Sequence, residues 1–272
     1  MLVSLLGSVS LVAAVAAETR PGALDDLRVA KGSNHIAEAW LADATTRYRH
    51  FVLGAPYEAA SVVAKLQDGR AAKLTLPEDS VFEDRQPRLA DLDGDGRDEI
   101  VLVRSYLGRG AALAIVALVG DRLKVVAESP PTGSPHTWIN PAGIADFDGD
   151  GRLDVAYVQM PHVLGRLRLW TLQAGKLIER AAMPDVSNHV AGSRQIGLAA
   201  VADFDGDGTM DLAIPSLDRR WLRFIAFKGG ARELRRVPLP SPAVADFAIA
   251  TENGKPVVVV GLGGGKKLRI AY

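Results

Sequence analysis

Short runs of apolar and β-branched residues alternate with polar turns along most of the chain. Between residues 154 and 183 the runs read DVAYVQ, GRLRLWTL and LIERAAM, and the turn QAGK joins the last two. Residues 211–239 repeat this order with DLAIPS, RWLRFIAF and ELRRVPL. Apolar residues that alternate with charged ones, between clusters of Gly and Pro, are typical of β-strands, and no stretch keeps a helical period. The pattern predicts an all-β protein.

An acidic stretch precedes these runs and occurs three times, as LADLDGDGRDEIVLV, IADFDGDGRLDVAYV and VADFDGDGTMDLAIP. Their first aspartates, Asp91, Asp146 and Asp203, are 55 and 57 residues apart. Two weaker copies, around Asp43 and Asp246, keep an Ala-Asp pair but lack the other acids. Self-similarity at a fixed period of this length indicates a repeat architecture, here with five units.

Each clear unit has one short run before the acidic stretch and three after it, which makes four strands. Four antiparallel strands repeated about every 50 residues are the pattern of a β-propeller blade. Residues 18–272 divide into five units of about 51 residues, close to the observed spacing, and six or seven blades would need shorter units. We therefore predict a single all-β domain over residues 18–272, a propeller of five four-stranded blades. The blade units are expected to start near residues 36, 85, 140, 196 and 241.

The two ends of the predicted ring are incomplete. The last unit ends one strand short, while the N-terminal run Leu24–Ala30 has no unit of its own. Pairing the two would close the ring and hide two exposed strand edges. We expect the N-terminal strand to complete the last blade.

The acidic stretches carry carboxylates at their first, third, fifth and ninth positions, and glycine at the fourth and sixth. Glycine at the sixth position suits a tight turn that needs positive φ. Alternate side chains of a curled loop can all point inward, and the seventh residue can add its backbone carbonyl. With one bidentate carboxylate this makes about six or seven oxygen ligands, which suits Ca²⁺ and not a Zn²⁺ site of His and Cys. The candidate ligands of about three calcium sites are Asp91, Asp93, Asp95, Arg97 and Glu99; Asp146, Asp148, Asp150, Arg152 and Asp154; and Asp203, Asp205, Asp207, Thr209 and Asp211.

Other interpretations of these stretches are weaker. Four carboxylates so close together would repel one another without a cation, which favours a metal in the folded loop. An EF-hand needs Glu at its twelfth position, whereas the stretches have Leu102, Tyr157 and Ile214 there and strands on both sides. A catalytic carboxylate pair belongs once, in a cleft, and not three times around a ring. An exposed acidic turn without metal is the alternative that remains.

The stretch ADFDGDGxxD(V/L) resembles the calcium-binding FG-GAP/VCBS repeat, the unit of integrin α-subunit propellers and of many exported bacterial proteins. FVLGAP at residues 51–56 is similar to the strand that gives the repeat its name. The resemblance covers three units strongly and two weakly. It implies that the loop carboxylates bind calcium, and it does not extend to a calcium site around Asp43 or Asp246, where the acids are missing. It implies no particular ligand.

The N-terminal segment predicts export. Its first 17 residues are apolar and uncharged, and Val15–Ala17 suits a signal-peptidase site. We predict that residues 1–17 are a signal peptide and that the protein is periplasmic or extracellular, where weak calcium modules are typical. Because no Lys or Arg precedes the apolar run, a retained membrane anchor and a buried strand are the alternatives. We expect no membrane span in the mature chain.

A ligand site is expected at the end of the propeller opposite the acidic loops. Each loop follows the innermost strand, so that the connections between units gather at the other mouth. Four of these connections, KGSNHIAEAW, EDRQPR, SPPTGSPHTWINP and PDVSNHVAGSRQ, are rich in polar and aromatic residues. They could bind a sugar or an acidic group, or they could only cap loop backbone. The candidate ligand-binding residues are His35, Arg85, His136, Trp138, His189 and Arg194.

These features favour an exported, calcium-stabilised, non-catalytic binding or scaffold module, a monomer with a protein or glycan partner. The 32 Lys and Arg residues are scattered and balanced by 32 acids, so no nucleic-acid partner is expected. No Ser-His-Asp pattern, P-loop or nucleotide fingerprint occurs. The alternative is a carbohydrate-active hydrolase or a lectin with a site at the axial mouth. A hydrolase needs two opposed carboxylates, and only Glu38, Glu83 and Asp84 lie near that mouth outside the loops.

Overall fold

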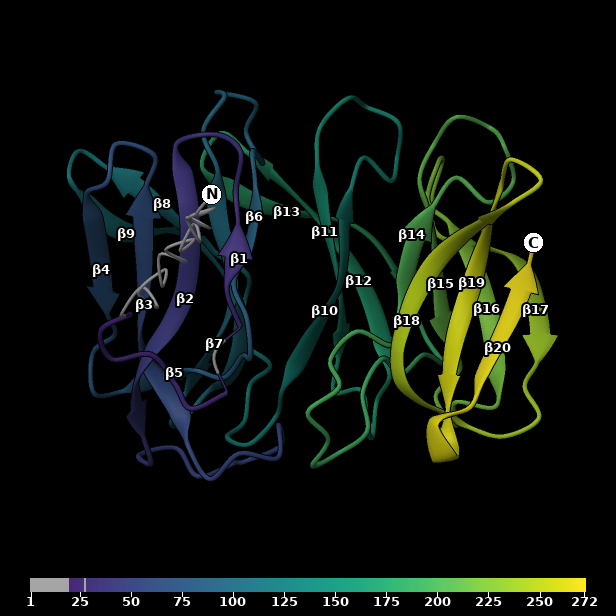
Figure 1. Ribbon diagram of the computed structural model, residues 1–272, viewed down its shortest axis with the longest axis horizontal. Coiled ribbons are helices and arrows are strands. Elements are labelled where there is room, and N and C mark those ends of the chain that lie inside the picture. The colour runs from purple at the N-terminus through teal and green to yellow at the C-terminus, as the bar shows by residue number, and fades with distance from the viewer. Residues whose placement is uncertain (1–19, 27) are drawn as a thin grey trace, which may run out of the picture.

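The computed structural model describes residues 20–26 and 28–272, and these residues form an all-β structure (Figure 1). The predicted signal peptide, residues 1–17, lies outside the described residues. Over the described residues the chain forms twenty strands and one short 3₁₀ helix, η1 (Gly263–Gly265). No helix in this part of the chain has the length and apolar character to cross a membrane. The all-β prediction is confirmed.

The strands fall into groups along the chain. The first group is β1 (Ala30–Lys31), β2 (Ile36–Thr45), β3 (Glu58–Leu66) and β4 (Ala71–Thr75), followed by the short β5 (Ser80–Phe82). The second group is β6 (Arg88–Ala90), β7 (Glu99–Tyr106), β8 (Gly110–Val119) and β9 (Arg122–Glu128). The third is β10 (Ile139–Ala145), β11 (Asp154–Gln159), β12 (Arg166–Gln173) and β13 (Lys176–Met183). The fourth is β14 (Ala200–Ala202), β15 (Asp211–Pro215), β16 (Trp221–Ala226) and β17 (Arg232–Pro238), and the fifth is β18 (Ala243–Glu252), β19 (Lys255–Leu262) and β20 (Lys267–Ala271).

Every group is an antiparallel meander in which consecutive strands pair. In the second, third and fourth groups the acidic loop joins the first strand to the second, so the predicted order of one run before the loop and three after it is confirmed. In Figure 1 the first and second groups overlap on the left, the third lies in the middle, and the fourth and fifth overlap on the right. First strands of neighbouring groups contact each other, as β10 contacts β14 and β14 contacts β18. This arrangement puts the acidic loops at one end of the molecule.

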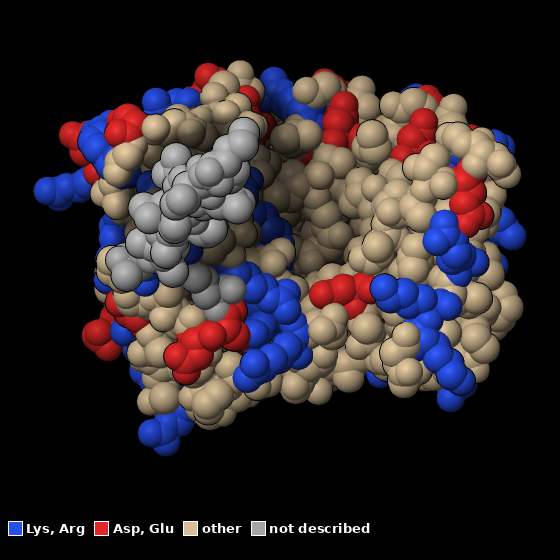
Figure 2. Space-filling view, in the orientation of Figure 1, with Lys and Arg blue, Asp and Glu red and all other residues tan. Residues whose placement is uncertain are grey.

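The structure does not divide the described chain into five separate four-stranded blades. The first two groups form one nine-stranded sheet, because β5 pairs with both β3 and β7. Two four-stranded sheets follow, and the last sheet, β18–β20, has three strands. The sheets do not close into a ring, and Figure 2 shows the molecule hollowed between its two halves.

The prediction that the N-terminal strand completes the last blade is wrong. Strand β1 pairs with β2, and Ala23 forms a further bridge with Ala42, so this segment belongs to the first sheet. Its apolar residues bury a small cluster around Trp40 and Val63, which would otherwise be exposed on that face of the sheet. The guanidinium of Arg20 lies 5.9 Å from the centroid of the Trp40 ring. Burial of this face explains why the segment pairs here.

The acidic loops are anchored in the cores between the groups. The residue at the second position of each loop, Leu92, Phe147 or Phe204, is almost completely buried, and each belongs to a different hydrophobic cluster. The Phe147 ring packs edge-on against Phe227, with centroids 5.2 Å apart, and Phe204 does the same with Phe224 at 5.0 Å. The Phe204–Phe224 contact lies within the fourth group, but the cluster of each loop residue also contains residues of the next group, so each loop contributes to the packing between its own group and the next.

We expect Phe147→Ala to lower the free energy of unfolding by about 3–5 kcal/mol, because it leaves a cavity between two sheets. The matched control is Val163→Ala, at a side chain that is 74% exposed, where a change within about 0.5 kcal/mol is expected. Denaturant unfolding followed by tryptophan fluorescence measures both. Equal stability of the two variants would show that the loop residue does not hold the sheets together.

Candidate metal centres

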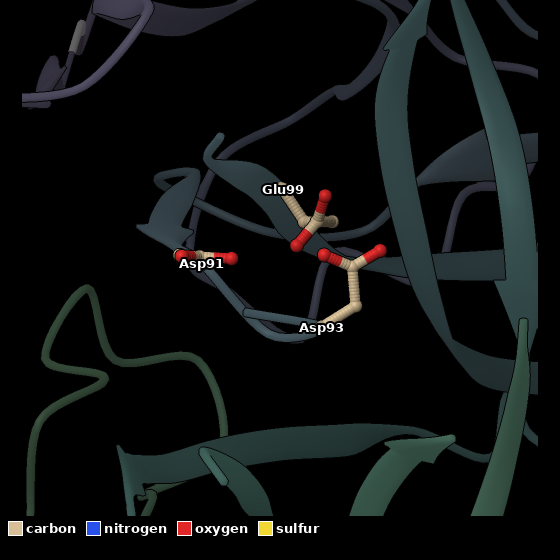
Figure 3. A group of neighbouring side chains, drawn as sticks. All are labelled: Asp91, Asp93 and Glu99. Atoms are coloured by element: carbon tan, nitrogen blue, oxygen red, sulfur yellow. The ribbon is translucent and has the colours of Figure 1, made fainter. Parts of the chain in front are cut away.

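Three groups of carboxylates gather at the acidic loops, each made of the first, third and ninth residues. Within each group the three candidate ligand atoms lie within 4.8 Å of one another. In the first group, Asp91 and Asp93 come from the loop and Glu99 from the start of β7, and their carboxylates face one another (Figure 3). The groups are Asp91, Asp93 and Glu99; Asp146, Asp148 and Asp154; and Asp203, Asp205 and Asp211.

The first aspartate closes the loop around itself. In the first loop the N–H of Gly94 donates to Oδ1 of Asp91 and the N–H of Gly96 donates to Oδ2, both at 2.9 Å. The same two bonds recur in the other two loops. Both glycines have positive φ, 79° and 83°, a conformation that side chains other than glycine rarely adopt. The repeated Gly pair is therefore required by the turn.

The fifth and seventh residues lie outside the three-carboxylate groups. Oδ1 of Asp95 accepts the N–H of Arg97 at 2.8 Å, and Asp150 and Asp207 accept the corresponding N–H groups of Arg152 and Thr209. These carboxylates shape the second half of the loop. Of the predicted calcium ligands, the structure thus brings three carboxylates of each loop together.

The carboxylate at the ninth position of each loop is buried and is hydrogen-bonded to the residue of the same loop that fills the core. Glu99, Asp154 and Asp211 are at most 4% exposed. Oε2 of Glu99 accepts the N–H of Leu92 at 2.8 Å, and the other two carboxylates accept the N–H groups of the equivalent phenylalanines at 3.2 and 3.0 Å. Burial, reinforced by the charge of the neighbouring aspartates, raises the pKa of Glu99 to about 7 and that of Asp154 and of Asp211 to about 6. A cation would relieve both effects.

The three loops differ in the basic side chains around them. Arg180 contacts Asp148 and Asp150 of the second loop at 3.2 and 3.0 Å. The third loop has looser contacts: Arg232 lies 3.7 Å from Asp205, and Lys228 lies 3.9 Å from Asp207. Among the described residues, no ion pair reaches the aspartates of the first loop. The first loop is therefore the most open to a metal ion.

The two weak copies have other roles. Asp43 lies inside β2, the second strand of its sheet, so it does not occupy the place of Asp91. Its Oδ2 accepts a hydrogen bond from Ser61 and pairs with Lys73, both at 2.5 Å. Oδ1 of Asp246 accepts the N–H of Gly197 at 2.7 Å. Both carboxylates are used by protein donors.

The predicted ligand-binding residues are only partly brought together. The rings of Trp138 and His189 lie 4.8 Å apart, and His136 lines the same cavity as Trp138. Arg85 forms an ion pair with Asp26. Arg194 directly follows Ser193, whose carbonyl oxygen lies 3.1 Å from Nε2 of His189, and its own carbonyl accepts a hydrogen bond from Arg28. His35 lies apart from this group, because it precedes β2 and its Nδ1 accepts the N–H of Asp98 beside the first acidic loop.

Sequence reasoning missed two residues of this group, His50 and His162, which lie in turns inside the repeats and not in the connections between them. Burial lowers the pKa of His162 and of His189 to about 4, so both imidazoles are neutral near pH 7. The signal that could have found them is position: the turn after a second strand lies at the same end as the connections.

A family profile described as the FG-GAP-like repeat matches residues 91–157 and 146–214. These residues include the three acidic loops and the strand that follows each of them. No curated protein compared with the chain matches it.

We expect the metal-free protein to lose stability, relative to Glu99→Gln, as the pH rises from about 5 to about 8. The pKa of Glu99 is raised in the folded protein, so protonated Glu99 adds to the free energy of unfolding below the ordinary carboxyl pKa. This stabilisation is lost as the pH rises through about 7. The variant carries no charge at this position at any pH. Denaturant unfolding of both proteins in chelator measures the difference, which also cancels the titration of the buried histidines. A constant difference would contradict the raised pKa.

Proposed function

Because the chain belongs to the FG-GAP repeat proteins, we propose that it is a calcium-stabilised β-propeller that acts as a non-catalytic binding or scaffold module. The observation that carries the proposal is the same group of three carboxylates in three successive loops. Each group offers only oxygen atoms, the ligands that Ca²⁺ prefers.

Calcium fits the charge of these loops. A buried carboxylate with a raised pKa, beside two further aspartates, is favourable in its charged form only with a cation. Backbone carbonyls at the seventh position, in Arg97, Arg152 and Thr209, would add ligands to the three carboxylates. Because the second residue of each loop lies in the core between groups, a filled loop would also stabilise the packing of the sheets.

The proposed role is binding rather than catalysis. The three acids predicted near the opposite mouth all have protein partners. Glu38 pairs with Arg20 at 2.7 Å, Asp84 pairs with Arg88 at 2.8 Å, and Glu83 is hydrogen-bonded to a histidine and a serine. A glycosidase would need two opposed carboxylates free to meet a substrate. The partner is proposed to be a protein or a glycan that docks at this mouth.

Export of the protein is proposed together with calcium binding. The apolar segment 1–17 has the character of a signal peptide, and weak calcium modules work where calcium is millimolar, outside the cytoplasm. Detection of the mature protein outside the cytoplasm, with an N-terminus at residue 18, tests this part of the proposal by itself.

Calcium is expected to raise the melting temperature of the protein, by a stabilisation of about 2.7 kcal/mol per site at a hundredfold excess over Kd. Asp93→Asn, Asp148→Asn and Asp205→Asn should each remove part of this increase, because each breaks one group of three carboxylates. Glu78→Gln is the matched control, since that side chain is 92% exposed and remote from the loops. Calorimetric melts in calcium and in chelator provide the measurement. The same melting temperature in calcium and in chelator would show that the loops are acidic turns that bind no metal.

Arg180→Gln is expected to tighten calcium binding at the second loop, up to about fivefold, because an exposed ion pair contributes about 0–1 kcal/mol. The variant is best made in the Asp93→Asn/Asp205→Asn background, where only the second loop remains intact. Isothermal titration with calcium compares it with Arg168→Gln, an arginine that pairs with Glu179 on the neighbouring strand and not with a loop carboxylate. Unchanged or weaker binding in Arg180→Gln would show that the guanidinium does not compete with the metal.

A further inference from the structure

Two neighbouring histidines link strand groups at the end opposite the acidic loops. His162 lies in the turn between β11 and β12, and His189 lies in the connection between β13 and β14. Nε2 of His162 lies 2.9 Å from Nδ1 of His189, and Nε2 of His189 lies 3.1 Å from the carbonyl oxygen of Ser193. The two rings thus form a hydrogen-bond chain from a turn of the third group to the connection that leads to the fourth.

The carbonyl at the end of this chain fixes where the hydrogens lie. Because a carbonyl oxygen only accepts, Nε2 of His189 carries a hydrogen. In the neutral ring Nδ1 of His189 is then an acceptor, so Nε2 of His162 donates to it and Nδ1 of His162 keeps its lone pair. One further proton can enter at that lone pair without breaking the chain. A second proton cannot, because the two charged rings would then point hydrogens at each other.

The residues on both sides of Ser193 join the same connection to the first group. The N–H of Gly192 donates to the carbonyl of Val52, in the turn after β2, at 2.8 Å. The carbonyl of Arg194 accepts a hydrogen bond from Arg28, which precedes β1, at 2.8 Å. The bond from His189 to Ser193 therefore shapes the segment that reaches from the connection to the first group.

A pair of uncharged side chains holds the two ends of this segment. Nδ2 of Asn140 donates to the carbonyls of Asn188 and Ile196 at 3.2 and 2.9 Å. Nδ2 of Asn188 donates in return to the carbonyls of Asn140 and Pro141 at 3.0 and 3.1 Å. Amides do not titrate, so these bonds are the same in acid and at neutral pH. The titratable part of the connection is thus confined to the residues between the two ends.

The surroundings of both rings oppose a positive charge. Burial, reinforced by the charges of Arg219 and His50, lowers the pKa of His162 to about 4. Burial also lowers the pKa of His189 to about 4, reinforced by the charges of His162, Arg219 and Arg85 and partly offset by the carbonyl to which His189 donates. Both rings are therefore neutral in the closed arrangement at pH 7.

Two carboxylates next to these charged groups already have other partners. Glu83 lies 2.6 Å from Nδ1 of His50 and accepts the hydroxyl of Ser105 with its other oxygen. Asp26 forms an ion pair with Arg85. Neither is hydrogen-bonded to His162 or His189, whose ring bonds go to each other and to the backbone.

We propose that the His162–His189 pair is an acid-sensitive latch, which holds the connection between β13 and β14 closed at neutral pH and releases residues 189–195 when both rings are protonated. A histidine in water titrates near about 6.5, so the released segment takes up protons that the closed one resists. Because the pKa of each ring is lowered in the closed form, the latch is fully closed above that value and is lost as the pH falls toward about 4. This regulation goes beyond the proposed binding role and does not rest on it.

Release of the latch has an optical consequence. Trp138 is 2% exposed, and the His189 ring packs edge-on against it with centroids 4.8 Å apart. When His189 leaves, the indole gains contact with water. We expect the tryptophan emission to move to longer wavelength as the latch opens.

The test follows the full chain, saturated with calcium, from pH 7 to pH 4 by nuclear magnetic resonance and by tryptophan fluorescence. We expect the backbone N–H signals of Gly192 and Ser193 to shift together with the fluorescence, with a midpoint between about 4 and about 6.5. The double variant His162→Gln/His189→Gln should lose this transition, because its amides can form the same hydrogen bonds and do not titrate. Each single variant should move the midpoint to lower pH, since one ring alone takes up one proton.

His35→Gln is the matched control, because His35 lies beside the first acidic loop and should leave the transition unchanged. Melts in calcium at pH 7 verify that each variant folds, and the single variants serve if the double variant does not.

Four outcomes overturn the proposal. The signals of Gly192 and Ser193 stay constant down to pH 4; or the transition persists in the histidine variants; or His35→Gln removes it; or its midpoint moves with the calcium concentration, which assigns it to the acidic loops. None of these outcomes depends on whether calcium stabilises the fold, which the melts at pH 7 measure separately.

Discussion

A buried carboxylate at the end of each acidic loop links the charge of the loop to the packing of the sheets. Glu99, Asp154 and Asp211 each begin the second strand of their group, and each accepts the N–H of the residue whose side chain fills the neighbouring core. Desolvating such a group is costly unless its charge is balanced, whereas the apolar side chain two positions into the loop gains from burial. Loop charge and sheet packing are therefore set by the same few residues, and neither can change alone.

The antiparallel meander places the carboxylates of the loops at one end of the molecule and most of the histidines at the other. The loop after each first strand collects carboxylates, and the turns after the second strands together with the connections collect histidine and tryptophan. Strand β11 has six residues between its acidic loop and the turn that carries His162, a distance of roughly 20 Å. Two sets of side chains so far apart have no residue in common.

The sequence was sufficient for the repeated elements and insufficient for the ends of the chain. The acids, the glycines and the apolar second residue recur in register, so the loops and the strands that follow them could be predicted. The pair Ala42-Asp43 resembles the repeat in sequence but not in structural position. The first group starts at β1, so Asp43 lies in the second strand, whereas the first aspartate of each acidic loop follows the first strand of its group. Nothing in the local pattern shows which edge a short N-terminal strand joins, since that depends on the apolar face it covers around Trp40.

The site opposite the loops was harder to predict for a related reason. His136, Trp138 and His189 lie in connections whose composition drew attention to them. His50 and His162 lie in turns within the repeats, where the only signal for a single histidine is its position after a second strand. Their proximity follows from the meander, which returns every second turn to the same end, and for His50 it also depends on β1 being the first strand of its group.

The loops at the histidine end also hold the first and fourth groups together where no strand does. The N–H of Gly192 donates to the carbonyl of Val52 at 2.8 Å, and Arg28 donates to the carbonyl of Arg194 at 2.8 Å. These bonds connect the segment around β1 and the turn after β2 with the connection before β14. The last sheet has only three strands and β1 belongs to the first, so strand pairing does not close the molecule. Hydrogen bonds between loops, one from a backbone N–H and one from an arginine side chain, connect these segments instead, and the cavity lined by His50, His136 and Trp138 lies at the same end.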